Sequence, residues 1–170
     1  MDDDARLAKA AAAGDAAAFS QLVRRHEGSV RRFLLRLSGQ SADDLAQEAF
    51  IQAWRFGSTW RGTGTYRSWL IGIAWTQFLN ARRADQRRTA RESHWEEEMA
   101  VTVEPTVRID VQRALAGLDE RERAAAILCF GEDFSHSEAA AIMGLPLGTL
   151  KSIVARARAR LTQKLEVLDD

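Results

Sequence analysis

The sequence predicts an all-α protein made of two small helical domains joined by a linker. Alanine, leucine, arginine and glutamate dominate its 170 residues, and the alternating valine, isoleucine and threonine of strands are nearly absent. Only Pro105 and Pro146 interrupt the helical pattern. Residues 89–110 are acidic and lose all helical periodicity. We therefore expect domains at 1–88 and 111–170, with 89–110 as an acidic, flexible linker.

The composition argues against several classes of protein. The single cysteine, Cys129, allows no intrachain disulfide, which fits a reducing cytoplasm. It falls in an apolar helix with no histidine or second cysteine at ligand spacing, so we expect a buried packing residue, no metal and no cofactor. No run of ~18 apolar residues occurs, and the acidic start "MDDDARLAK" lacks the apolar part of a secretory signal. We therefore expect a cytoplasmic location and no membrane insertion.

Charge is segregated along the chain, although 24 acidic and 24 basic residues cancel. Residues 60–91 hold seven arginines and one acid, and residues 92–110 hold six acids and one arginine. Between Pro146 and Glu166 there are five basic residues and no acidic one. Two basic zones separated by an acidic one suggest a polyanion partner such as a nucleic acid. A charged face that meets only water explains any single run about equally well.

The first two predicted helices have clear boundary signals. One helix covers about 4–13 and ends at Gly14, and Asp15 caps a second that Gly39 closes. Helical spacing places a set of mostly apolar residues on one side of this second helix: Phe19, Leu22, Val23, His26, Val30, Phe33, Leu34 and Leu37. Because His26 falls among these positions, we expect it to be a plain packing residue.

A third helix is expected to begin at Ser41, with Asp44 completing a capping pair, and to run to Phe56. One side is apolar, with Phe50 and Trp54 at its edge: Ala42, Leu45, Ala46, Ala49, Ala53 and Phe56. The opposite side is mostly polar: Asp44, Gln47, Glu48, Ile51, Gln52 and Arg55. A lone exposed isoleucine needs no explanation, but Ile51 among these polar residues would also suit a protein-binding surface.

A glycine- and threonine-rich loop, "GSTWRGTGTYR", precedes a long helix over 68–88 that ends in arginines. Trp60, Trp69 and Trp75 lie in this segment. Aromatic rings beside arginines suit single-stranded nucleic acid, because bases stack on rings at ~1–3 kcal/mol each while guanidinium groups hold phosphates. Trp69 is favoured as a core residue because it shares a face with Tyr66. For Trp60 and Trp75, core packing and base stacking both remain open.

The C-terminal part carries two capping boxes and a tight turn. Asp119 with Glu122 starts one helix, which Gly131 ends, and Ser135 with Glu138 starts a short helix ending at Gly144. A turn then leads into "LPLGTLKSIVARARARL". This order of a short helix, a glycine-containing turn and a second helix predicts a helix-turn-helix at about 135–160.

The second helix of this unit has an apolar stripe and a basic, small-residue face. The stripe is Leu147, Leu150, Val154, Ala157 and Leu161. Facing away from it are Ser152, Ala155, Arg156 and Ala159, flanked by Thr149, Lys151 and Arg160. Small residues between basic ones let a helix enter the major groove, where arginine can fork onto guanine. A basic face turned only to water is the alternative.

These segments together resemble a known family, the extracytoplasmic-function sigma factors of bacterial RNA polymerase, which are small two-domain members of the sigma-70 family. "DDLAQEAFIQAW" resembles the family's polymerase-clamp helix, and "TYRSWLIGIAWTQFLNARRADQRR" resembles its −10 element helix. "ALAGLDERERAAAIL" through "SHSEAAAIMGLPLGTLKSIVARARARL" resembles its −35 element domain. The resemblance covers nearly the whole chain, and the order of the motifs makes it specific.

The resemblance implies partners and site residues. The partners would be core RNA polymerase, through the clamp coiled coil of its largest subunit and its flap, together with promoter DNA and an anti-sigma protein. The polymerase-binding residues would be Asp44, Gln47, Glu48, Ile51, Gln52 and Arg55. The −10 residues would be Arg61, Thr63, Thr65, Tyr66, Trp75, Arg82, Arg83, Arg87 and Arg88. The −35 residues would be Ser137, Thr149, Lys151, Ser152, Ala155, Arg156 and Arg160.

Three residues depart from the family's usual pattern, since Gly72, Trp75 and Asn80 stand where the family often carries Arg, Arg and Asp. The resemblance implies a sigma factor without catalytic residues, which binds core polymerase, directs it to a promoter and helps to melt the −10 region. One alternative is a helix-turn-helix regulator that binds duplex DNA without polymerase. Another is a helical adaptor that binds only proteins, in which both arginine zones would tolerate reversal to glutamate.

Overall fold

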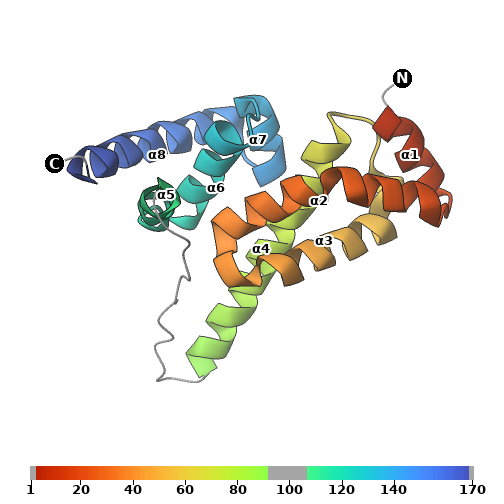
Figure 1. Ribbon diagram of the computed structural model, residues 1–170, viewed down its shortest axis with the longest axis horizontal. Coiled ribbons are helices and arrows are strands. Elements are labelled where there is room, and N and C mark those ends of the chain that lie inside the picture. The colour runs from red at the N-terminus through yellow and green to blue at the C-terminus, as the bar shows by residue number, and fades with distance from the viewer. Residues whose placement is uncertain (1–2, 92–106, 169–170) are drawn as a thin grey trace. The chain divides into compact units, whose positions relative to one another are not determined.

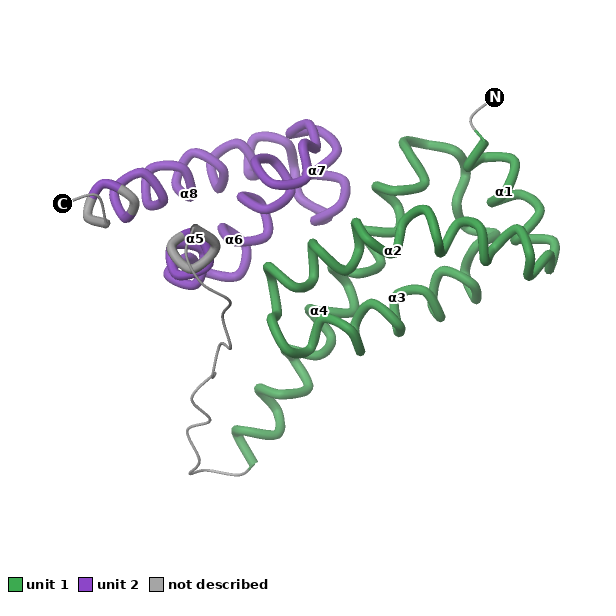
Figure 2. Tube along the Cα trace, viewed as in Figure 1, with its two compact units in different colours: residues 1–99 green, residues 100–170 purple. Residues whose placement is uncertain are grey.

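The computed structural model describes residues 3–91 and 107–168, and every regular element in these ranges is a helix (Figure 1). The chain divides into two compact units, residues 1–99 and 100–170 (Figure 2). The prediction of an all-α fold with two helical domains is confirmed.

The first unit is built from four α-helices and two short 3₁₀ turns. The α-helices are α1 (Asp3–Ala12), α2 (Ala16–Ser38), α3 (Ala42–Phe56) and α4 (Tyr66–Arg91). The turns η1 (Gly39–Ser41) and η2 (Gly57–Thr59) flank α3. Helices α2, α3 and α4 pack against one another, and α1 packs on α2. The core between them is made of Leu22, Phe33, Leu34, Ala49, Leu70 and Ile71.

The start of α2 follows from its local sequence. The Asp15 carboxylate accepts hydrogen bonds from the backbone N–H groups of Ala17 and Ala18, at 2.9 and 3.0 Å. Gly39 ends the helix with φ +61°, a value that side chains other than glycine rarely adopt. Both predicted signals are confirmed.

His26 does more than pack. It is buried, as expected, but its Nε2 also lies 2.7 Å from Oδ2 of Asp4 on α1. On the neighbouring position of α2, Arg25 forms ion pairs with Asp3 and Asp4. These polar contacts tie α1 to α2, and helical spacing could not reveal them because their partners are more than 20 residues apart in sequence.

Two expectations for α3 are wrong. The Ser41 side chain makes no capping hydrogen bond, because Ser41 already has helical φ and ψ in η1, and the Ala42 N–H bonds to the Gly39 carbonyl. Phe56, placed on the apolar side, is 54% exposed. A helical wheel treats every turn alike, but Phe56 is the last residue of α3, where the chain leaves for η2.

The second unit contains α5 (Val107–Ala116), α6 (Glu120–Ala126), a π-helical turn η3 (Ile127–Gly131), α7 (His136–Met143) and α8 (Leu147–Leu168). Helix α8 packs on α5, α6 and α7. Helices enter both ends of the segment expected to be a linker, since α4 continues to Arg91 and α5 starts at Val107. The rest of that predicted linker, 92–106, lies outside the described residues.

Helices α7 and α8 form the predicted helix-turn-helix. The Ser135–Glu138 capping box is present, and Gly144 ends α7 in the left-handed conformation, at φ +64°. The two helix axes meet at 105°, within the range of this motif. Leu150, Val154 and Ala157 of the predicted stripe are buried, whereas Leu147 is exposed at the start of α8.

Within 3–91 and 107–168, no single helix is long and apolar enough to cross a membrane. Helix α7 and Leu147–Lys164 of α8 reach that length and composition only when the bent pair is counted together.

Candidate functional site

The predicted polymerase-binding residues lie on the surface of α3. Asp44, Gln47, Ile51 and Arg55 are exposed, and Glu48 and Gln52 are half-buried. The Gln52 amide donates a hydrogen bond to Oε1 of Glu48 at 2.5 Å. The six positions recur at three- and four-residue spacing, so one face of α3 carries them all.

An apolar groove adjoins this face, and the sequence reasoning missed it. It lies between α2 and α3 and is lined by Phe19, Val23, Gln47, Phe50, Ile51 and Trp54. The rings of Phe19 and Trp54 are 5.0 Å apart, and Trp54 is 41% exposed. The sequence feature that could have indicated this groove is the position of Phe50 and Trp54 at the edge of the apolar side of α3. The groove and the polar face together form one surface, which we call the α3 surface.

The loop before α4 exposes Arg61, Thr63 and Thr65. Gly62 and Gly64 both have φ +74°, which glycine adopts without strain. Thr65 also starts α4, because its Oγ1 accepts a hydrogen bond from the Ser68 N–H at 3.0 Å. Its hydroxyl thus has a local structural role besides any contact with DNA.

Two residues predicted to contact the −10 element are buried. Tyr66 packs among His26, Trp60 and Trp69, with ring centroids 5.3–5.6 Å apart. Burial, with a smaller contribution from the Asp4 charge, raises the pKa of Tyr66 to about 12. The indole N–H of Trp60 is also buried, without a hydrogen-bond partner among the described residues.

Trp75 is the second buried residue, and it stacks on Phe78 at 5.6 Å with an interplanar angle of 22°. It lies one turn from Ile71, on the core side of α4. Tyr66 and Trp75 therefore belong to the core in this structure, and neither ring offers a face for a base to stack on. The sequence could not distinguish the two roles, because the same aromatic residues serve in a hydrophobic core and on a surface that stacks bases.

The arginines near the end of α4 form the basic part of the first unit. Arg83, Arg87 and Arg88 are exposed, and Arg82 is half-buried. Arg88 lies 3.7 Å from Asp85, an exposed pair of small energetic value. These guanidinium groups suit contacts with phosphate, which arginine can bind through two parallel hydrogen bonds.

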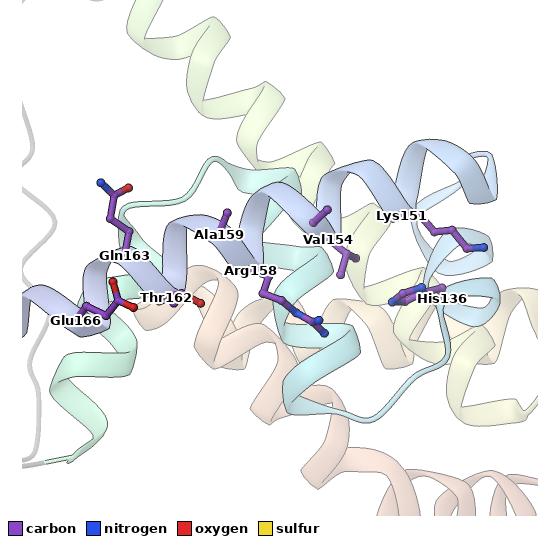
Figure 3. Close-up of a pocket in the computed structure, with 9 residues that line it drawn as sticks. His136, Lys151, Val154, Arg158, Ala159, Thr162, Gln163 and Glu166 are labelled. Carbon is purple, nitrogen blue, oxygen red and sulfur yellow. The ribbon is translucent and has the colours of Figure 1, made fainter.

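The predicted −35 residues lie on the surface of α7 and α8. Ser137 is exposed on α7. On α8 every predicted residue is exposed: Thr149, Lys151, Ser152, Ala155, Arg156 and Arg160. Figure 3 shows an adjoining shallow pocket along α8, with His136 and Lys151 at one end and Thr162, Gln163 and Glu166 toward the other.

Two of these cations share one buried carboxylate. Oε2 of Glu122 accepts a hydrogen bond from Arg160 at 2.8 Å, and Oε1 lies 3.6 Å from Nε of Arg156. The Glu122 side chain is only 2% exposed, while the two arginine side chains are more than half exposed. Sequence reasoning placed Glu122 only in a capping box. Its arginine partners lie 34 and 38 residues away, beyond any local pattern.

Other reactive or ligating groups are sparse. Cys129 is half-buried, and burial raises the pKa of its thiol. Among the described residues, no three histidine, cysteine, aspartate or glutamate side chains are grouped as metal ligands would be.

Comparisons with known proteins identify both units. Residues 22–88 match the family described as Sigma-70 region 2, and residues 108–161 match Sigma-70, region 4. The ECF RNA polymerase sigma factor SigM of Mycobacterium tuberculosis is 36% identical over 169 residues, covering 98% of this chain and 86% of that protein. SigE of Mycolicibacterium smegmatis is 35% identical, covering 91% of this chain and 65% of that protein.

A solved structure supports the same assignment. The sigma factor RpoE of Bartonella quintana, crystallised with the anti-sigma factor NepR, superposes with a TM-score of 0.78 at 30% identity. The match covers 88% of this chain and 97% of RpoE. Because relatives above 30% identity align across both helical units, this chain belongs to the extracytoplasmic-function sigma factors of the sigma-70 family.

Proposed function

We propose that this chain binds core RNA polymerase, directs it to specific promoters and helps to melt the −10 region. The observation that carries the proposal is the alignment of SigM, an RNA polymerase sigma factor, with 98% of this chain. The chain has no catalytic role of its own in this proposal, and it acts in the cytoplasm, where transcription occurs.

The α3 surface is the proposed polymerase-docking site. Exposed apolar groups beside charged ones suit a protein partner, because burying them removes apolar area from water while the polar rim sets the orientation. Ile51 and Trp54 would be the apolar contacts, and Gln47 and Glu48 the polar ones.

Arg61, Thr63 and the arginines of α4 are the proposed contacts to the −10 region. Extruding a base costs a few kcal/mol, which contacts to the base and backbone must repay. Because Tyr66 and Trp75 are buried, we assign them to the support of the loop and of α4 rather than to base stacking. The exposed guanidinium groups of Arg83, Arg87 and Arg88 would hold the backbone.

Helix α8 is the proposed −35 recognition helix. Its exposed face has small residues, Ser152 and Ala155, next to Lys151 and Arg156. That combination lets the helix approach base edges in the major groove, which is ~12 Å wide. Arg156 would contact a guanine, while Lys151 and Arg160 would contact phosphates.

Run-off transcription tests this proposal. Purified chain is mixed with core RNA polymerase and fragmented genomic DNA, and the transcripts are mapped. We expect transcripts with discrete start sites that are absent when the chain or the polymerase is omitted. DNA binding by the chain alone, with no polymerase association and no transcripts, would instead support the helix-turn-helix regulator.

We further propose that an anti-sigma protein controls this chain by covering the α3 surface. RpoE was crystallised with the anti-sigma factor NepR, and CnrH, 27% identical with a TM-score of 0.73, with the cytosolic domain of CnrY. The exposed groove with Ile51 and Trp54 offers an inhibitor an apolar site.

Affinity capture from native cells, with and without Trp54→Ala, tests this control. We expect a stoichiometric partner that blocks run-off transcription and is lost on the substitution. Recovery of polymerase alone, with no such inhibitor, would contradict the proposal.

A further inference from the structure

Glu122 belongs to the capping box that starts α6 and also contacts two arginines of α8. It is the third residue of α6, and its N–H bonds to the Asp119 carboxylate at 2.8 Å. Its own carboxylate accepts from the Asp119 N–H, which completes the capping box. A capping box needs only this much, and the neighbouring box of Ser135 and Glu138 has the same bonds.

The Glu122 carboxylate makes two further contacts that a cap does not require. Arg156 and Arg160 are four residues apart, so they lie one above the other on the same side of α8. Each approaches a different carboxylate oxygen, Oε1 for Arg156 and Oε2 for Arg160. The Arg156 contact is through Nε, the guanidinium nitrogen nearest the backbone.

Glu122, Arg156 and Arg160 differ in burial, so the cluster has a buried acidic side and an exposed basic side. The carboxylate is almost wholly buried, whereas the side chains of Arg156 and Arg160 are 60% and 53% exposed. Glu122 thus holds each guanidinium from the protein side while much of each side chain faces solvent. A long arginine side chain would otherwise sample many rotamers, and ordering them on DNA would cost entropy.

We propose that Glu122 is a positioning residue for promoter recognition, which fixes Arg156 and Arg160 in the orientation that contacts the −35 DNA. This inference rests on the proposed role of α8. Glu122 touches no DNA in this account. It also offsets part of the charge of the two arginines, so that α8 gains base discrimination at the expense of bulk attraction to phosphate.

Glu122→Gln tests the proposal, and Glu138→Gln is its matched control. Glutamine serves at this position of a capping box, and its oxygen can still accept from Asp119 and Arg160. Its NH₂ group would then face Nε of Arg156, which replaces an attraction by a donor–donor clash. Glu138→Gln removes the same charge from the same motif, in which the contacts of Glu138 are with Ser135.

The assay uses polymerase holoenzyme reconstituted with the full chain, and selects from promoter DNA randomised across the −35 region. The base pair whose preference falls most, but not completely, with Arg156→Ala identifies the Arg156 contact. We expect Glu122→Gln to weaken that preference roughly tenfold. Affinity for non-promoter DNA should rise, with the slope of log affinity against log salt steeper by about 1. Glu138→Gln should leave the base preference unchanged, whatever its effect on non-promoter DNA.

The double variant shows whether Glu122 acts through Arg156. In the Arg156→Ala background, Glu122→Gln should cause no further loss of preference at that base pair. An unchanged preference in the single variant, or an equal loss in both backgrounds, would overturn the proposal. If wild-type holoenzyme shows no −35 preference at all, the proposed role of α8 fails instead.

Hydrogen exchange separates positioning from structural support. Glu122→Gln should keep the protection of the α6 and α8 amides. If it does not, Glu122→Asp serves in its place, because it keeps the charge but shortens the reach to both arginines. Loss of base preference with protected amides supports the proposal. Full preference in Glu122→Asp, or loss of protection in both variants, overturns it.

Discussion

At the scale of single residues, burial decides which groups can meet a partner. Tyr66 and Arg156 were both predicted to contact DNA, yet Tyr66 is 3% exposed and the Arg156 side chain is 60% exposed. The role of Tyr66 is therefore tested by measuring the stability of the fold, and the role of Arg156 by measuring which DNA sequences are bound.

Tyr66 should make the first unit sensitive to alkaline pH. Its pKa is about 12 in the fold against an ordinary value of 10.0, so the unfolded chain releases this proton first as pH rises. Stability should be intact below pH 10 and fall by about 2 kcal/mol as pH approaches 12. Tyr66→Phe should flatten this loss in denaturant titrations. Because Tyr66 is the only tyrosine, its ultraviolet titration reports the pKa directly, and a midpoint near 10 would contradict the prediction.

Arg156→Ala should cost ~1–3 kcal/mol of promoter binding and relax preference at one −35 position. The guanidinium can donate two hydrogen bonds to a guanine, and alanine leaves that base edge unpaired. Holoenzyme binding to matched promoter variants measures the effect. An equal loss on every DNA sequence would show that Arg156 contacts only the backbone.

At the scale of elements, local capping residues determine where the helices end, whereas tertiary packing stabilises the helix interiors. Asp15, the two capping boxes and Gly144 act within a few residues of themselves. Glycine has opposite effects at the two kinds of position. It weakens a helix interior, whereas it relieves strain where the chain turns with a positive φ.

Gly28→Ala should stabilise the first unit by up to about 1 kcal/mol. Gly28 lies in the middle of α2 and is exposed, and an added Cβ would meet only the end of the Arg32 side chain, at 3.4 Å. All five tryptophans precede Met99, so their fluorescence during denaturation reports this unit. A lower midpoint would show that the contact with Arg32 outweighs the gain in helix propensity.

Gly144→Ala should destabilise the helix-turn-helix by about 1 kcal/mol. The added Cβ would meet no atom within 4 Å, so the cost comes from φ +64° and not from a clash. This loss of stability should appear as faster hydrogen exchange of the α7 and α8 amides. Gly148→Ala is the control, because its added Cβ also meets no atom within 4 Å but its φ is not positive. Equal exchange in the two variants would contradict the strain argument.

At the scale of the whole molecule, the chain carries separate surfaces for separate partners. The α3 surface has the chemistry of a protein interface, while the exposed faces of α4 and α8 carry arginines. Because these surfaces share no residues, a change in one should spare the others.

Gln47→Ala with Glu48→Ala should weaken binding to core polymerase about tenfold while leaving DNA binding by α8 intact. Both side chains lie on the outer face of α3, so their loss removes contacts without opening the core. Fluorescence anisotropy with core polymerase measures the affinity. Gln21→Ala with Glu27→Ala, on the exposed side of α2, is the control, and equal losses in the two pairs would remove the docking assignment.

The sequence by itself determined the all-α fold, most helix ends and the exposed face of α8, because caps and helical periodicity act over a few residues. Only the tertiary structure decided that Tyr66 and Trp75 are core, that Ser41 does not cap, and that His26 bonds to Asp4. It also brought Glu122 to Arg156 and Arg160 and opened the groove beside Ile51. Apart from Ser41, whose conformation is set within the local turn η1, each of these depends on residues from different helices, and no spacing within one helix specifies which neighbour will cover it.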